Sequence, residues 1–189
     1  MRRLTAIGVL LPACVGVLPA QAAPASATVQ VKGVVKGTCA LPSTAPITFS
    51  TVVPASGKLD PALANLSWTI SGLSCNTGSI IAISARSLRL NAARNSLTPS
   101  QSQAVNYTAT ASGWSPNAAR VTTGDATSLG TTILYTGTAQ SQAAPKSGTI
   151  IISVSNFTLS TNKGSSANSA KPVDGAYSAT IILNLAPSI

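Results

Sequence analysis

Short runs with an apolar residue at every second position recur along most of this chain, separated by Gly, Pro, Asn and Ser. This pattern is typical of strands with one buried face, because successive side chains of a strand point to opposite sides. Almost no stretch shows the 3.6-residue period of an amphipathic helix. We therefore predict strands over Thr28–Lys36, Thr38–Leu41, Ile47–Val53, Leu66–Leu73, Ser79–Ala85, Val105–Ser112, Thr131–Tyr135, Gly148–Leu159 and Ala176–Leu185.

Many short strands joined by turn residues predict an all-β chain, folded as an immunoglobulin-like antiparallel β-sandwich. Two Ser- and Asn-rich stretches, Asn91–Ala104 and Ser160–Asp174, are predicted to be long loops. Trp68 lies in an alternating run and is expected in the core. Trp114 lies at a strand end, where packing in the core or at its rim is favoured over a platform for sugars.

The N-terminal residues 1–22 have the three parts of a secretory signal peptide. Arg2–Arg3 supply the positive start, Leu4–Leu18 form the apolar segment, and Ala20–Ala22 form a small-x-small cleavage site. A lipoprotein box at Leu11–Cys14 is the competing interpretation, disfavoured because the residues after it remain apolar. We predict cleavage after this leader, no membrane span, an extension over residues 23–36, and one domain over residues 37–189.

Titratable residues are few, and they limit the possible chemistry. The chain has 12 Lys and Arg residues, 3 acidic residues and no His, for a formal net charge of +9. Without His, a nucleophile–His pair cannot form. Asp60, Asp125 and Asp174 each lie beside Pro or Gly, which is typical of turns. We therefore predict no enzymatic activity, no catalytic residue, no metal site and no cofactor.

The excess of positive charge raises the question of nucleic acid as a partner. The basic residues are scattered and few aromatic residues lie among them, so no stacking platform is visible. Arg86, Arg89 and Arg94 form a loose basic run that is expected to be a solvated edge. We predict no nucleic-acid binding.

The cysteines predict one disulfide. Cys14 is removed with the leader, which leaves Cys39 and Cys75 as a pair in an oxidising compartment. Two thiols with no His and few carboxylates cannot complete a metal site. We therefore predict that Cys39 and Cys75 form a disulfide between strands.

One glycine in the first predicted strand needs an explanation. Val29, Val31, Gly33 and Val35 share a face of this strand. A glycine inside a strand contributes no packing and costs backbone entropy. Either a bulge occurs here, since Val35 follows another valine and breaks the alternation, or the glycine serves a close contact with another chain.

The stretch TVQVKGVVKGTCAL, Thr28–Leu41, resembles the N-terminus of chaperone–usher pilins, the subunits of bacterial fimbriae. Those proteins have an alternating extension with one inward glycine, followed soon by a first half-cystine, here Cys39. Cys75 matches the second half-cystine, and Gly175–Ala179 matches the G-x-[FY]-x-A start of their last strand. The family's near-terminal Tyr is missing. The small, Thr- and Ala-rich chain is also similar to archaic pilins and spore-coat-U domains, and residues 77–169 match only as generic β structure.

The resemblance implies a sandwich that lacks its final strand and is completed by the N-terminal extension of the next subunit, which is a form of strand addition. Such a head-to-tail contact does not close and therefore propagates as a fibre. The resemblance assigns donor positions to Val29, Val31, Gly33 and Val35, and one wall of the acceptor groove to Tyr177, Ala179, Ile181 and Leu183.

The resemblance also implies partners and a location. The partners are neighbouring subunits in a homo- or heteropolymer, a periplasmic chaperone and an outer-membrane usher. The location is the periplasm in transit and then the cell surface, with a role in a pilus and in cell adhesion. The alternative is a stand-alone secreted module of the spore-coat-U kind, whose first strand completes its own fold.

Overall fold

The computed structural model of the chain describes residues 33, 35–42, 46–92, 94, 97–98, 101–124, 133–159 and 171–188. The chain divides into two units, residues 1–34 and 35–189. Nearly all described residues belong to the second unit. The predicted leader and most of the predicted extension lie outside the described residues.

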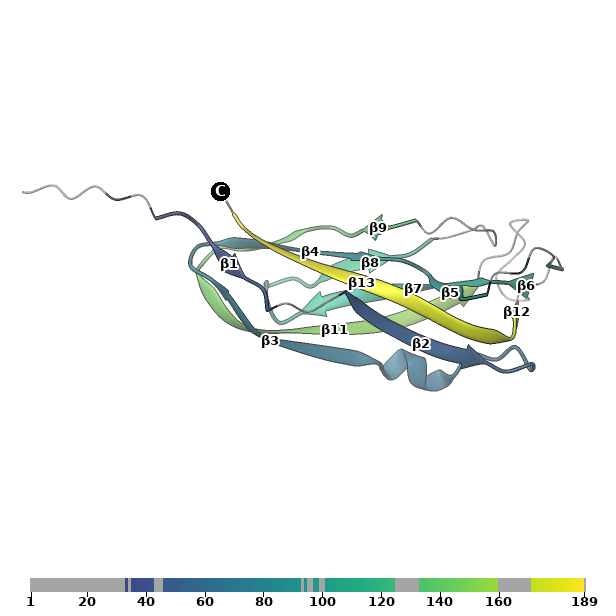
Figure 1. The fold of residues 1–189 in the computed structure, drawn as a ribbon. Helices are drawn as coiled ribbons and strands as arrows, with labels where there is room; N and C mark the ends of the chain where they lie inside the picture. The colour runs from purple at the N-terminus through teal and green to yellow at the C-terminus, as the bar shows by residue number, and fades with distance from the viewer. Residues whose placement is uncertain are drawn as a thin grey trace, which may run out of the picture. The chain divides into compact units, whose positions relative to one another are not determined.

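The second unit is a β-sandwich, which confirms the predicted fold class (Figure 1). One layer contains β1 (Cys39–Ala40), β3 (Ser67–Cys75), β11 (Lys146–Leu159), β7 (Ala104–Ser112) and β8 (Ala119–Thr122). The other contains β2 (Ile47–Val53), β13 (Gly175–Pro187), β4 (Ser79–Ala85), β9 (Tyr135–Thr136) and β10 (Gln140–Gln142). All these pairings are antiparallel, and β5 (Leu88–Leu90) joins the layers by pairing with both β7 and β13.

Three short elements lie outside this scheme. The strands β6 (Gln101–Ser102) and β12 (Lys171–Pro172) form a small parallel pair. The 3₁₀ helix η1 (Pro61–Asn65) connects β2 to β3. Pro61 at its start and the Asp60 carboxylate, which accepts a hydrogen bond from the Ala62 N–H at 2.9 Å, explain why the helix begins there.

The alternating runs become the long strands. β2 and β4 match the predicted ranges at both ends, and β3, β7, β11 and β13 overlap theirs closely. The predicted loops Asn91–Ala104 and Ser160–Asp174 contain the short strands β6 and β12, respectively. Two strand predictions also need correction. In Thr131–Tyr135 the described residues are 133–135, and of these Tyr135 alone lies in a strand, while Ile133 and Leu134 are exposed. In Thr28–Lys36 the described residues 33, 35 and 36 are not in a strand, because among the described residues they have no strand to pair with.

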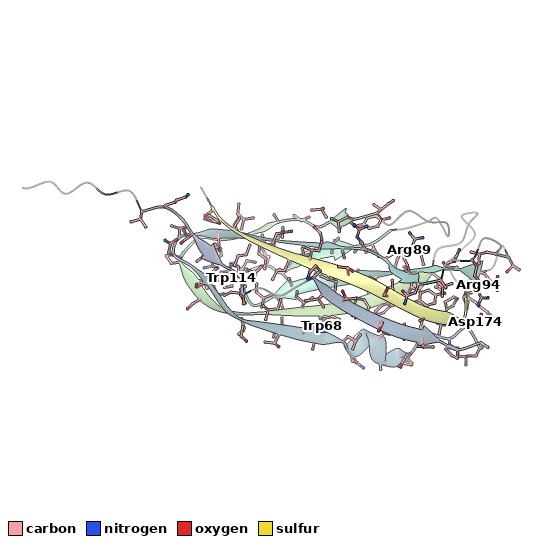
Figure 2. All side chains as sticks on the ribbon, in the orientation of Figure 1. Trp68, Arg89, Arg94, Trp114 and Asp174 are labelled. Atoms are coloured by element: carbon pink, nitrogen blue, oxygen red, sulfur yellow. A yellow bond between two sulfur atoms is a disulfide. The ribbon has the colours of Figure 1, made fainter. Side chains whose placement is uncertain are left out.

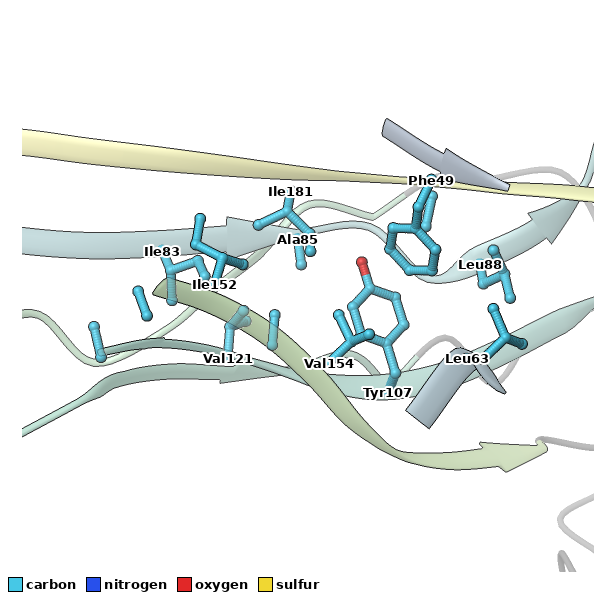
Figure 3. Packing of buried hydrophobic residues seen from close by; sticks show 14 of the residues in the cluster. Phe49, Leu63, Ile83, Ala85, Leu88, Tyr107, Val121, Ile152, Val154 and Ile181 are labelled. Atoms are coloured by element: carbon cyan, nitrogen blue, oxygen red, sulfur yellow. The ribbon is translucent and has the colours of Figure 1, made fainter. Parts of the chain in front are cut away.

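The core is filled by the inward faces of both layers. Its aromatic centre joins four strands: the Phe49 ring lies 5.5 Å from that of Trp68 and 5.4 Å from that of Tyr107, whose ring lies 5.9 Å from that of Phe157. Figure 3 shows Phe49 and Tyr107 facing each other across this core. Trp68 is partly buried against the core, as its alternating run predicts.

The predicted disulfide is present. Cys39 and Cys75 lie directly opposite each other in the β1–β3 pair, and their sulfur atoms are bonded. The bond closes a chain segment with a sequence separation of 36. It therefore attaches the very short strand β1 to the edge of the first layer.

The last strand is fixed at its start by a buried tyrosine. Tyr177 is fully buried, and its hydroxyl donates a hydrogen bond to the Val173 carbonyl oxygen at 2.8 Å. The Ser102 carbonyl oxygen lies 3.2 Å away. Burial raises the pKa of Tyr177 to about 12, against a partial lowering by the hydrogen bond to Val173.

The raised pKa of Tyr177 predicts that strong alkali destabilises the folded protein. The folded state holds the phenolic proton more tightly than the unfolded chain, whose tyrosine pKa is about 10. This tighter proton binding stabilises the fold fully below pH 10. The stabilisation, roughly 2 to 3 kcal/mol in total, is lost as the pH rises toward 12. We expect urea denaturation, followed by circular dichroism, to show a shallower alkaline loss of stability in Tyr177→Phe. Ser178→Ala, on the other face of the strand, should keep the wild-type slope; equal slopes in all three proteins would contradict the assignment.

Candidate functional site

The acidic residues of the described part of the chain serve structural roles. No group of three or more His, Cys, Asp or Glu side chains that could hold a metal ion occurs among them. Asp60 caps η1, and the Asp174 carboxylate pairs with the Arg94 guanidinium at 3.1 Å. Figure 2 shows Arg94, Asp174 and Arg89 near the same end of the sandwich. Asp125 lies outside the described residues.

The candidate site is instead a strand edge, and it lies on β13. The first half of this strand, Gly175–Ile181, pairs with β2 along one side. The second half, Ile181–Pro187, pairs with β4 along the other side. Among the described residues no strand pairs with the β2 side of residues 182–187, so this half of β13 has one free row of backbone hydrogen-bonding groups. We call residues 182–187 the open half of β13.

The outer strands beside this opening also have free edges. β2 pairs only with β13, and β3 pairs with β1 only at Ser74 and Cys75, among the described residues. The chain passes from β1 in one layer to β2 in the other, because β1 binds β3 and β2 binds β13. Among the described residues, the outer edges of β2, of most of β3 and of the open half of β13 therefore pair with no strand.

Apolar side chains accompany the opening. Leu183 and Leu185 of the open half are only partly buried against the core. The same is true of apolar residues from the neighbouring strands and their flanks, namely Leu41, Ile47, Leu66 and Trp68. Partly buried apolar side chains beside an unpaired strand edge are a surface on which an added strand would bury further area.

The four predicted acceptor residues fall on two different halves of β13. Tyr177, Ala179 and Ile181 lie on the half that β2 covers, and they are buried. Leu183 lies on the open half and is partly buried. Of the four residues, Leu183 is therefore the one beside the free edge.

Of the four predicted donor residues, Val29 and Val31 lie outside the described residues. Gly33 is exposed, and a Cβ added to it would meet no atom of the described residues within 4 Å. The Val35 side chain is 77% exposed although it is a large apolar group. Val35 lines a cavity of about 450 Å³ with Gly37, Thr77 and Pro187.

The base of the extension is fixed to the sandwich by Asn76, a residue that the sequence patterns did not single out. Its amide nitrogen donates a hydrogen bond to the Lys36 carbonyl oxygen at 3.1 Å, and its amide oxygen accepts one from the Thr38 N–H at 2.7 Å. Between them, a Cβ added at Gly37 would lie 2.9 Å from Thr77 Oγ1 and 3.0 Å from Pro187 Cβ. A side chain at position 37 would therefore force Thr77 or Pro187 to shift, so the close packing here favours glycine.

Trp114, Arg86 and Arg89 do not contribute to this opening. Trp114 is fully buried, in agreement with the prediction that it packs in the core or at its rim, and Figure 2 shows it on the sandwich. Arg86 and Arg89, predicted on a solvated edge, are half-buried. No helix within the described part of the chain is both long and apolar enough to cross a membrane.

Comparison of this chain with known family models, with curated proteins and with solved structures finds no match.

Proposed function

We propose that this protein is a structural subunit of a bacterial surface fibre, joined to its neighbours by strand addition. The N-terminal extension of one copy, residues 23–36, would pair with the open half of β13 in the next copy. The single observation that carries the proposal is this free strand edge with its partly buried leucines, Leu183 and Leu185. Main-chain hydrogen bonds would supply affinity, and alternating side chains would fill the apolar surface.

The lengths of the two segments support the pairing. The open half spans residues 182–187, which at the rise of a strand is roughly 20 Å. The alternating donor positions Val29 to Val35 span a similar length in extended form. A segment of this length would cover the edge from Ile182 to the end of the strand.

Gly33 fits the role of a donor-strand glycine. It occupies the face of the extension that Val29, Val31 and Val35 share. In a donor strand, a glycine allows the acceptor backbone to approach closely.

The exposure of Val35 supports pairing between copies rather than within one copy. This residue joins the extension to the sandwich, is not in a strand, and leaves 77% of its side chain exposed. By the family resemblance, a periplasmic chaperone would cover the opening before assembly and an outer-membrane usher would release the fibre to the cell surface, where it would act in adhesion.

Two complementary variants test the proposal. Gly33→Asn alters the donor strand, and Leu183→Glu places a charge in the open half of β13, so each variant alone should lose the ladder of oligomers that the wild type forms. Mixed together they should give a dimer and nothing larger, because each retains one intact half of the contact. Gel filtration and native electrophoresis of the leader-free proteins measure this.

A peptide provides the control. Excess peptide of sequence TVQVKGVVK, residues 28–36, should shorten the wild-type oligomers, while the same peptide with Asn in place of Gly33 should not. Thermal unfolding should show that Gly33→Asn keeps wild-type monomer stability. Oligomers of normal length from both variants, or a wild type that remains a stable monomer without any chaperone, would refute strand addition and favour the stand-alone module.

A further inference from the structure

The disulfide lies at the rim of the first layer, within reach of solvent. An open cavity of about 430 Å³ is lined by both cysteines together with neighbours that include Thr38, Asn76 and Lys146. β1 is the outermost strand of its layer, and among the described residues it pairs with β3 alone. A thiol can therefore approach this bond while the protein remains folded.

The two sulfur atoms of the bond differ in their surroundings. Cys75 is only 4% exposed, whereas Cys39 is partly buried at the edge of the core. In thiol–disulfide exchange the attacking sulfur approaches in line with the bond that breaks, so access behind each sulfur decides which one reacts. The line beyond Cys75 leads to β11, where Lys146 is its direct partner. The line beyond Cys39 leads away from the sheet, because no described strand pairs with the outer side of β1.

The charge around the bond is positive. Of the described residues that line the cavity, Lys146 alone is charged. Its ammonium is held in place by a hydrogen bond to the Trp114 carbonyl oxygen at 2.6 Å, and the whole chain has a formal net charge of +9. The attacking thiolate and the leaving thiolate are both anions, so nearby positive charge favours both.

We propose that the folded protein exchanges this disulfide with anionic thiols, which attack Cys39 Sγ. The sulfur of the reagent forms a bond with Cys39 Sγ, the bond between the two cysteines breaks, and its electron pair leaves with Cys75 as a thiolate. A second thiolate then attacks the reagent's sulfur in this mixed disulfide and releases Cys39 as a thiolate. Two thiols are thereby oxidised to one disulfide while the protein bond is reduced.

The exchange removes the covalent link between β1 and the rest of the layer. β1 and β3 share two residue pairs, so few hydrogen bonds hold β1 once the bond is reduced. The consequence for fibres rests on the proposed function: an anionic thiol would weaken the anchor of the extension. The exchange itself requires only the folded subunit.

The position of attack can be read from the trapped intermediate. The reagent is 2-mercaptoethanesulfonate, and N-ethylmaleimide stops the reaction and labels the released thiol. Trypsin cleaves after Lys36, Lys58 and Arg86, which places Cys39 and Cys75 on separate peptides. Mass spectrometry should find the reagent on Cys39 and the maleimide on Cys75, with a preference of at least about tenfold. Equal labelling of the two cysteines, or a preference for Cys75, would overturn the inference.

A matched pair of lysine variants tests the role of charge. At low salt, 2-mercaptoethanesulfonate should react roughly fivefold faster than the cationic thiol cysteamine, after division by the rates with the neutral hydroxyethyl disulfide. Lys146→Met should abolish most of this preference. Lys171→Met, which removes an equal charge from β12, should keep it. Equal preferences in the two variants would contradict the role of Lys146.

Both experiments use leader-free protein that also carries Gly33→Asn and Leu183→Glu, so that strand addition does not contribute. The rate of exchange should stay constant in urea below the unfolding transition, because the folded state reacts. A rate that rises in proportion to the unfolded fraction would show that only the unfolded chain reacts, and would also overturn the inference. None of these outcomes depends on whether the donor and acceptor variants alter fibre formation.

Discussion

Replacing both Cys39 and Cys75 by alanine is expected to lower the free energy of unfolding by roughly 4 kcal/mol. The disulfide closes a segment with a sequence separation of 36, and losing it restores that conformational freedom to the unfolded chain. The folded state also loses the link between β1 and β3, whose pairing consists of two residue pairs. Few hydrogen bonds remain to hold β1 at the edge.

Urea denaturation followed by circular dichroism checks this expectation, with reduced wild type as the second measurement. The double variant and the reduced wild type should agree, because both lack the same link. A loss below about 1 kcal/mol in both proteins would mean that the unfolded chain is not restrained by this bond.

Replacing Trp114 by alanine is expected to have an effect of similar size. The side chain is fully buried, and truncating a buried Trp costs roughly 3 to 5 kcal/mol. Its Nε1–H donates a hydrogen bond to the Ser79 hydroxyl at 3.0 Å, and Ser79 is itself fully buried. The truncation therefore also removes the donor to a buried hydroxyl, at a further cost of about 1 kcal/mol or more.

Lys146 contacts the Trp114 ring and also bonds to the backbone beside it. Its ammonium lies 5.7 Å from the ring centroid and donates hydrogen bonds to the carbonyl oxygens of Trp114 at 2.6 Å and Gly113 at 2.9 Å. These bonds hold the turn after β7, where Gly113 has a φ of 90°. Trp114→Phe keeps most of the ring volume and should lose less stability than Trp114→Ala. If the two variants were equally stable in urea, packing of this ring would not be the cause.

The sequence predicts the long strands of this fold well, because the pattern that marks each strand lies within its own residues. Ile47–Val53 and Ser79–Ala85 alternate or contain strong strand formers, and turn residues bound them. The strands β5 and β10, of three residues each, have no measurable period. Each of them pairs with longer strands, β5 with β7 and β13, and β10 with β4. A local sequence pattern does not show these partners, because they are distant in the sequence.

The candidate site, too, could be predicted from the sequence only in part. The alternation of β13 correctly marks its inward side chains, and Tyr177 and Ile181 are indeed buried. It does not indicate which edge of β13 is paired, because that depends on the register with β2, which runs from Gly175 opposite Val53 to Ile181 opposite Ile47. The boundary between the covered and the open half follows from this register alone.

Asn76 and the disulfide have a mechanical consequence. A pull on the residues before Gly37 enters the sandwich at Lys36 and Thr38, where Asn76 holds the chain, and reaches Cys39 one residue later. From there a covalent bond carries the tension into β3, which is paired along its length with β11. The load therefore bypasses the weak pairing of β1 and reaches a strand held by a long ladder of hydrogen bonds.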